Sequence, residues 1–270
     1  MTEVRLTKRI EFAAAHRYHR DEWDAARNRA VFGACWNAPG HGHNYLLEVT
    51  VVGAVDEATG MVVNLYDLKS VLKQVLEEFD HKHLNLDTPY FARTIPTSEN
   101  IARVFWGRLM KHPEIGRLEK IRLYEDENLS AEIAGPGAEA TVTRRYRFSA
   151  GHRLYDERLA PEANIDRFGP CGGPAHHGHN YLLSVSVQGP VDGQTGMVVN
   201  LTALDEAVRA SVLARVDRRD LDQDRELAGR ATGERLARFI WECLVKALPA
   251  GRLARIGLEE TPDAYFEYAG

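Results

Sequence analysis

The residues best suited to chemistry occur twice in this 270-residue chain. Cys35 is followed by His41 and His43, and the same Cys-x5-His-x-His spacing recurs 136 positions later. Histidines two apart on a strand project to the same side, and His16 ends the preceding apolar stretch. Three neutral imidazoles with an open fourth position are typical of catalytic zinc. The sequence therefore predicts one Zn²⁺ per copy, held by His16, His41 and His43 in the first and by His152, His177 and His179 in the second.

A thiol precedes each predicted metal site. Cys35 and Cys171 lie in loops rich in glycine and proline, just before the paired histidines. A thiol near a cation and imidazoles ionises readily and can act as a base or a nucleophile. Cys243 lies in an amphipathic helical pattern, and we interpret it as a small buried apolar residue.

The pair Asp80-His81 and two glutamates have both a catalytic and a structural interpretation. Asp80 precedes His81, so the carboxylate could orient the imidazole as a base that activates the thiol. The same histidine could instead complement the dipole of a helix that ends there. Glu99 could cap the next helix, and Glu125 could be a solvated residue after a strand. Taken singly, none of these groups decides between the two interpretations.

These groups are carried by two copies of one unit. The stretch HGHNYLL and the motif GMVVNL repeat at an offset of 136, and TSENIARVFW matches TGERLARFIW at 135. We predict a first unit over residues 1–134, a linker over 135–140 and a second unit over 141–270. Two units are too few for a solenoid, so a fused oligomer is the better interpretation.

The hydrophobic pattern indicates how each unit positions its site. In the first copy, alternation predicts one strand ending at His16 and another from His41 to Val51. Asn64 is a plausible cap for a helix that buries Leu65, Leu68, Leu72, Val75 and Phe79. A second helix starts near 97–98, and strands follow near 118–124 and 129–134. The order β-β-α-α-β-β predicts an α+β fold, an antiparallel sheet covered on one face by two helices.

Composition excludes several kinds of partner. The net charge of −5 argues against bulk attraction to nucleic acid or to an anionic membrane. No apolar run reaches the ~18 residues of a membrane span, and no signal peptide is predicted at the start. Three cysteines do not form a disulfide framework, so we expect a cytoplasmic protein.

Together these motifs resemble the 6-pyruvoyltetrahydropterin synthase family, which includes the 6-carboxytetrahydropterin synthases. The resemblance covers nearly all of both copies and rests on AAHR, the cysteine before HGHNY, GMVVNL, DHK, TSEN and YE. It implies the tunnelling fold, in which subunits pair their sheets into barrel rings, and zinc on the three histidines of each copy. It also implies a base, Cys35, in a relay with Asp80 and His81 that meets across a subunit interface. Glutamates matching Glu99 and Glu125 would anchor a pterin ring and assist the relay.

The substrate implied by the resemblance is 7,8-dihydroneopterin triphosphate, which would lose triphosphate by elimination. Mg²⁺ could accompany the triphosphate, although no residue demonstrates it. The spacing of six residues from Cys35 to His41 and the pair Asn64-Leu65 resemble the pyruvoyl-forming members of the family more than the carboxy-forming members. The alternatives are a 6-carboxytetrahydropterin synthase, which would also release acetaldehyde, and a lapsed pterin-binding scaffold.

The second copy departs from the pattern at one position. Arg218 replaces the relay histidine, and a guanidinium cannot accept a proton near neutral pH. Glu234 and Glu260 stand at the places of Glu99 and Glu125, so a pterin could still dock. We expect a homo-oligomer, a trimer of tandem chains that imitates a hexamer. Threefold symmetry would then give one ring of first copies, which is competent, and one ring of second copies.

Overall fold

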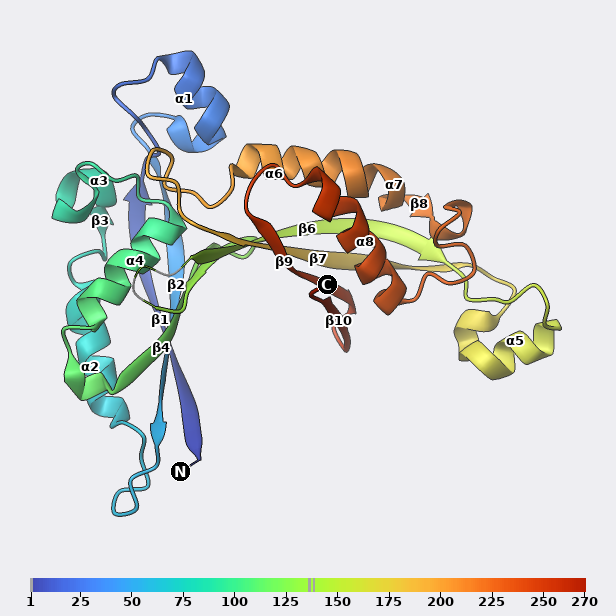
Figure 1. Ribbon diagram of the computed structural model, residues 1–270, viewed down its shortest axis with the longest axis horizontal. Helices are drawn as coiled ribbons and strands as arrows, with labels where there is room; N and C mark the ends of the chain where they lie inside the picture. Colours follow the sequence, from blue (N-terminus) through green and yellow to red (C-terminus); the bar gives the residue numbers. More distant parts are fainter. Residues whose placement is uncertain (1, 136, 138) are drawn as a thin grey trace. The chain divides into compact units, whose positions relative to one another are not determined.

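The computed structural model describes residues 2–135, 137 and 139–270. The chain divides into two compact units: residues 1–143 with 188–202, and residues 144–187 with 203–270. Figure 1 shows the helices and strands of both. The linker predicted at 135–140 includes Pro136 and Ala138, which lie outside the described residues, and Ala140 already belongs to a strand. The unit boundaries 1–134 and 141–270 stay a prediction.

The first unit contains an antiparallel sheet with one short parallel edge strand. Its strand order is β5-β4-β2-β1-β3. The bounds of these strands are β1 Glu3–His16, β2 His41–Ala54, β3 Lys82–His83, β4 Arg117–Asp126 and β5 Leu129–Ile133. Strands β1 and β2 pair from Glu3 opposite Ala54 to His16 opposite His41, which sets two of the predicted ligands side by side.

The alternation predicted for the first two strands is confirmed. Along β1 the buried residues are Phe12, Ala14 and His16, and the residues between them are more exposed. Phe12 stacks on Tyr45 of β2 at 4.9 Å between ring centroids and meets Phe105 edge-on at 5.5 Å. Because Phe105 belongs to a helix, the face that carries His16 is the face that the helices cover.

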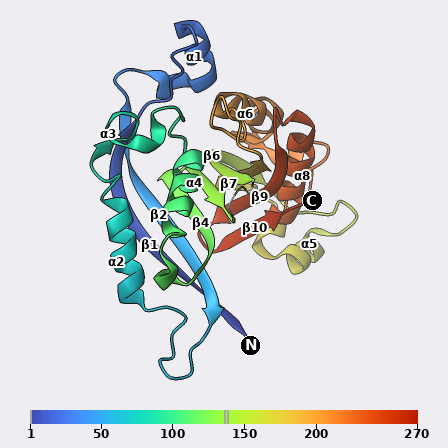
Figure 2. The same ribbon diagram turned by 60° about the vertical axis from the view of Figure 1, so that its left-hand side comes forward.

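Two longer helices cover this face, as predicted. Helix α2 spans Leu65–Leu76 with Asn64 as its N-cap, and α4 spans Ser98–Leu109 with Thr97 as its N-cap. Helix α4 packs against β4 and β5, and α2 packs against α4 and β1. Figure 2 shows α2 running alongside β1 and β2. The α+β fold predicted for each unit is therefore confirmed here.

Some details of the predicted helices are wrong. Leu65 was expected to be buried but is exposed, because it is the first residue of α2 and faces away from the sheet. Phe79 is buried, but it lies beyond the end of α2. The pattern also missed short elements in the connections, namely α1 Ala25–Phe32, the 3-10 turn η1 Gly33–Trp36 and α3 Leu84–Asp87.

The second unit has the same plan. Its strands follow the order β10-β9-β7-β6, and β8 pairs with β6 in parallel. The strands are β6 Ala140–His152, β7 His177–Gly189, β8 Arg219–Asp220, β9 Arg252–Thr261 and β10 Ala264–Tyr268. The helices are α5 Pro161–Phe168, the 3-10 turn η4 Gly169–Gly172, α6 Leu201–Val208, α7 Ala214–Val216 and α8 Gly233–Ala247, with a π-helical turn over Arg209–Leu213 between α6 and α7.

Among the described residues, no helix is both long enough and apolar enough to cross a membrane.

Candidate active site

Three imidazoles of the first unit converge at the end of the β1–β2 pair. His16 ends β1, and His41 and His43 begin β2 on the same side of the strand. The Nε2 atoms of His16 and His41 are 3.3 Å apart, and one ring nitrogen from each histidine lies within 4.8 Å of the others. The structure thus brings together all three residues predicted as ligands.

The surroundings of His16 keep its ring neutral and oriented. The ring is fully buried, and Nδ1 lies 3.1 Å from the carbonyl oxygen of Pro96. A carbonyl only accepts, so Nδ1 donates and the lone pair remains on Nε2, which points toward His41. Burial lowers the pKa of His16 to about 3. Burial also lowers the pKa of His41.

A buried carboxylate lies against this histidine cluster. Glu125, near the end of β4, is 4% exposed, and its Oε1 lies 3.5 Å from Nε2 of His43. Its Oε2 accepts hydrogen bonds from the Tyr18 hydroxyl at 3.1 Å and from Ser98 Oγ at 2.7 Å. Glu125 is therefore not the solvated residue of the structural interpretation. Its fixed position allows it to face a ligand bound beside the histidines.

These donors fit a divalent metal ion. The Nε2 atom of His43 is buried and has no hydrogen-bond partner among the described residues, as expected for an atom reserved for a ligand. The outer nitrogen of His16 is held by a backbone carbonyl, which is the usual support of a metal-binding imidazole. Neutral imidazoles are the form that binds zinc.

Glu99 lies in the first turn of α4 and is also buried. Its Oε1 accepts a hydrogen bond from the backbone N–H of Val198 at 3.0 Å. Burial raises the pKa of Glu99 to about 7, and the charge of nearby Glu125 acts in the same direction. A carboxyl group poised near neutral pH can accept from, or donate to, a polar heterocycle.

Cys35 lies within η1, at the edge of a small apolar cluster. Its carbonyl oxygen accepts the backbone N–H of Tyr18 at 2.9 Å, and its side chain packs against a cluster that includes Tyr18, Phe32 and Met197. The Tyr18 hydroxyl donates to Glu125, which lies against the histidine cluster. Tyr18 therefore connects the turn that carries Cys35 to that cluster. Tyr18 was not recognised in the sequence. The only signal was its position two residues after His16.

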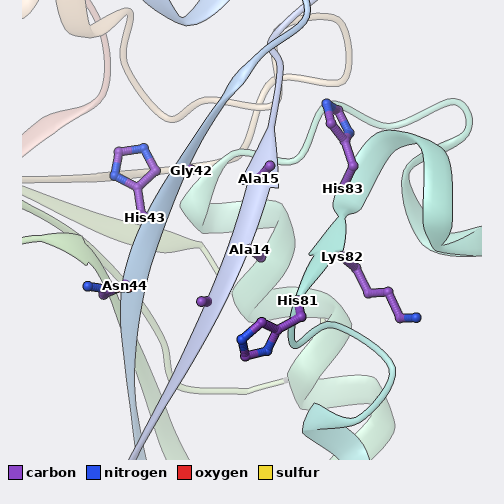
Figure 3. Close-up of a pocket in the computed structure, with 9 residues that line it drawn as sticks. Ala14, Ala15, Gly42, His43, Asn44, His81, Lys82 and His83 are labelled. Carbon is purple, nitrogen blue, oxygen red and sulfur yellow. The ribbon is translucent and has the colours of Figure 1, made fainter.

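Asp80 and His81 form the predicted pair, and His81 lines a surface hollow together with His43. His81 Nδ1 is 3.0 Å from Asp80 Oδ2, and Asp80 Oδ1 accepts the backbone N–H of Ala13. This backbone hydrogen bond is the main cause that lowers the pKa of Asp80. His81 has a positive φ of 56° and a side chain that is 82% exposed. Figure 3 shows His81 beside β1 and His43 on the far side of β2.

The second unit repeats the histidine cluster. The Nε2 atoms of His152 and His177 are 3.0 Å apart, and His179 completes the group. Glu260 lies 3.9 Å from both His152 and His179, as Glu125 lies against the first cluster.

The remaining second-copy residues differ more. Cys171 lies in η4, and its carbonyl accepts the N–H of Leu154, as in the first copy. Arg218 keeps the positive φ of His81, at 53°, and Asp217 accepts the N–H of Ser149. Glu234, however, is exposed where Glu99 is buried. The second copy therefore has the same backbone plan, but its counterpart of Glu99 is open to solvent.

Comparison with known proteins agrees with this duplicated site. The family model described as 6-pyruvoyl tetrahydropterin synthase matches twice, at residues 5–136 and 141–270. The chain belongs to the 6-pyruvoyl tetrahydropterin synthase family. The match covers both units, so the duplication predicted from the sequence is confirmed.

Individual relatives cover about half of the chain. A 6-pyruvoyl tetrahydrobiopterin synthase of Pongo abelii is 43% identical over 127 residues, which are 47% of this chain and 88% of the relative. A putative 6-carboxy-5,6,7,8-tetrahydropterin synthase of Archaeoglobus fulgidus is 38% identical over 110 residues, 38% of this chain and 88% of the relative. The solved Caenorhabditis elegans 6-pyruvoyl tetrahydropterin synthase is 36% identical, covers 50% of this chain and 97% of its own, and gives a TM-score of 0.48.

Proposed function

We propose that this protein is a zinc-dependent lyase that converts 7,8-dihydroneopterin triphosphate into 6-pyruvoyltetrahydropterin. The observation that carries the proposal is the cluster of His16, His41 and His43 with Glu125 against it, in a chain of the synthase family. Relatives named as synthases at about 40% identity support the same class of reaction. The predicted Mg²⁺ with the triphosphate stays an expectation.

The chemistry follows from the groups present. A divalent ion on the three imidazoles would polarise the side-chain oxygens of the substrate and acidify the adjacent C–H bonds. The Cys35 thiolate would take and return protons on that side chain, and triphosphate would leave with the electron pair of its C–O bond. Glu99 and Glu125 would accept hydrogen bonds from the amino and N–H groups of the pterin ring. The change is an internal redox shift, so no external redox cofactor is needed.

We propose that the relay acts across a subunit interface. His81 is exposed beside β1, and such a position suits an imidazole that serves a site of another subunit. We therefore propose a homo-oligomer, with three tandem chains supplying six units. In the second copy, Arg218 can hold a charge near the site but cannot cycle protons. We expect its cluster to bind metal and its pocket to accept a pterin without supplying the relay.

One incubation tests the proposal. Purified protein is supplied with 7,8-dihydroneopterin triphosphate, and triphosphate, acetaldehyde and the pterin product are measured. Triphosphate with a dicarbonyl pterin is the expected result. Acetaldehyde with a 6-carboxy pterin would instead favour the carboxy-forming reaction that the Archaeoglobus relative's name describes. Binding of metal and pterin without release of triphosphate would favour the third hypothesis, a pterin-binding scaffold that has lost its catalytic activity.

A further inference from the structure

A buried tyrosine of the first unit is replaced by leucine in the second. Tyr18 is 2% exposed, and its hydroxyl donates a hydrogen bond to Oε2 of Glu125 at 3.1 Å. Leu154 stands at the equivalent place, 136 positions later. Its backbone N–H donates to the Cys171 carbonyl at 3.1 Å, as the Tyr18 N–H donates to the Cys35 carbonyl at 2.9 Å. Leucine therefore serves this backbone contact equally well, and the hydroxyl of the tyrosine has a separate role.

A second hydrogen bond to the same carboxylate oxygen is also specific to the first unit. Ser98 Oγ donates to Oε2 of Glu125 at 2.7 Å. The equivalent residue of the second unit is Gly233, 135 positions later, and a Cβ there would overlap the ring of Phe266. Phe266 in turn stands where the first unit has the much smaller Ala131. The second unit therefore lacks both of the hydroxyls that hold the carboxylate in the first.

The two carboxylates consequently turn different oxygens toward their hydrogen-bond donors. In the first unit both hydroxyls use Oε2 of Glu125, and Oε1 lies 3.5 Å from Nε2 of His43. In the second unit the Tyr181 hydroxyl donates at 3.0 Å to Oε1 of Glu260. That same oxygen lies 3.9 Å from Nε2 of His179. The oxygen that faces the histidines is thus engaged by a tyrosine in the second unit, whereas the donors of the first unit hold the other oxygen.

A glutamate carboxylate needs such donors in order to keep one orientation. Its terminal torsion is broad, so the side chain alone does not fix the direction in which each oxygen points. A binding group that must meet a ligand with good geometry is therefore held by neighbouring hydrogen bonds. Two neutral donors on Oε2 of Glu125 supply this support, and they leave Oε1 directed at the histidine cluster.

We propose that Tyr18 and Ser98 are positioning residues of the first site, which hold Oε2 of Glu125 and aim Oε1 at the amino-bearing edge of the pterin ring. The inference rests on the proposed function, because it takes a pterin as the ligand. Glu125 is 4% exposed, so a ring that offers no N–H donor at this edge would leave a buried oxygen unpaired. The first site should therefore select an amino-substituted ring, and the second site, which lacks both hydroxyls, should select it less.

The packing of Tyr18 can be separated from its hydrogen bond. Its ring meets His16 edge-on at 4.8 Å between centroids and Phe32 at 6.0 Å. A phenylalanine would keep both contacts, so Tyr18→Phe removes only the hydroxyl. Burial raises the pKa of Tyr18 well above its ordinary value, so the phenol stays protonated and acts as a donor.

Calorimetric titration of the full-length chain with two rings tests the inference. The rings are pterin and lumazine, in which an oxygen replaces the amino group, and the tighter binding phase reports the first site. Tyr18→Phe should weaken pterin binding about tenfold and leave lumazine binding nearly unchanged, and Ser98→Ala should do the same. Tyr90→Phe is the matched control, because the Tyr90 hydroxyl donates to Glu78, a glutamate of the first unit outside the histidine cluster. It should bind both rings as wild type does.

The ratio of the two affinities distinguishes positioning from a structural role. A loss of affinity for pterin and lumazine in parallel would show that the hydroxyls only support the fold of the site, and it would overturn the inference. Unchanged pterin binding in both Tyr18→Phe and Ser98→Ala would overturn it as well. In either case a wild type that binds pterin and releases triphosphate leaves the proposed function standing. A wild type that binds neither ring would overturn the proposed function together with the inference.

Discussion

Two buried titratable groups of the first unit should affect its stability with opposite signs as the pH changes. His16 has a pKa lowered to about 3 and Glu99 a pKa raised to about 7, both because of burial. His16 favours folding when it is neutral, so its contribution is complete above its unfolded pKa of 6.5 and is lost as the pH falls toward 3. Glu99 favours folding when it is protonated, so its contribution is complete below 4.5 and is lost as the pH rises through 7.

The magnitudes follow from the two shifts. As the pH falls from 8 to 5, protonation of His16 in the unfolded state should lower the free energy of unfolding of the metal-free protein by about 2 kcal/mol. Over the same interval, protonation of Glu99 should raise the free energy of unfolding by about 2.5 kcal/mol. These two contributions should therefore nearly cancel in the wild-type unit.

Separate substitutions reveal the two effects. His16→Gln should remove the first effect, so this variant becomes more stable at pH 5 than at pH 8. Glu99→Gln should remove the second, so its stability falls by about 2 kcal/mol over the same change. The assay is urea unfolding of chelator-treated protein, followed by the resonance of fluorinated Trp106, which is buried in α4 of the same unit. Parallel pH profiles for the two variants would refute the reasoning.

Three further predictions concern the proposed site. His81→Ala should remove nearly all turnover while the metal content stays unchanged, and substantial residual activity that Cys171→Ala abolishes would show that the second copy is competent. His43→Ala should lower bound zinc from about two ions per chain to about one, measured by elemental analysis after dialysis. Cys35→Ser should retain both ions and pterin binding but lose triphosphate release, because the hydroxyl is a far weaker base than the thiolate; turnover near that of wild type would exclude Cys35 as the base.

The sequence by itself determined the local pattern of this protein. The repeat, the strand ending at His16 and the helix capped by Asn64 depend on periodicity, offset and short-range hydrogen bonds. The histidine cluster was predictable for the same reason, because strand geometry alone sets His41 and His43 on one side. The burial of Leu65 was predicted wrongly, since helical spacing does not show which end of a helix leaves the sheet.

Only the tertiary structure decided how distant segments meet. Glu125 could have been solvated, but the register of β4 against β2 places it against the histidines, where Tyr18 and Ser98 hold it. The burial of Glu99 depends on Val198, 99 positions away, and no local pattern encodes such a contact. Of the identical segments at 60–64 and 196–200, the first is partly exposed and the second is largely buried, because burial is a property of the surface that a segment meets and not of its own sequence.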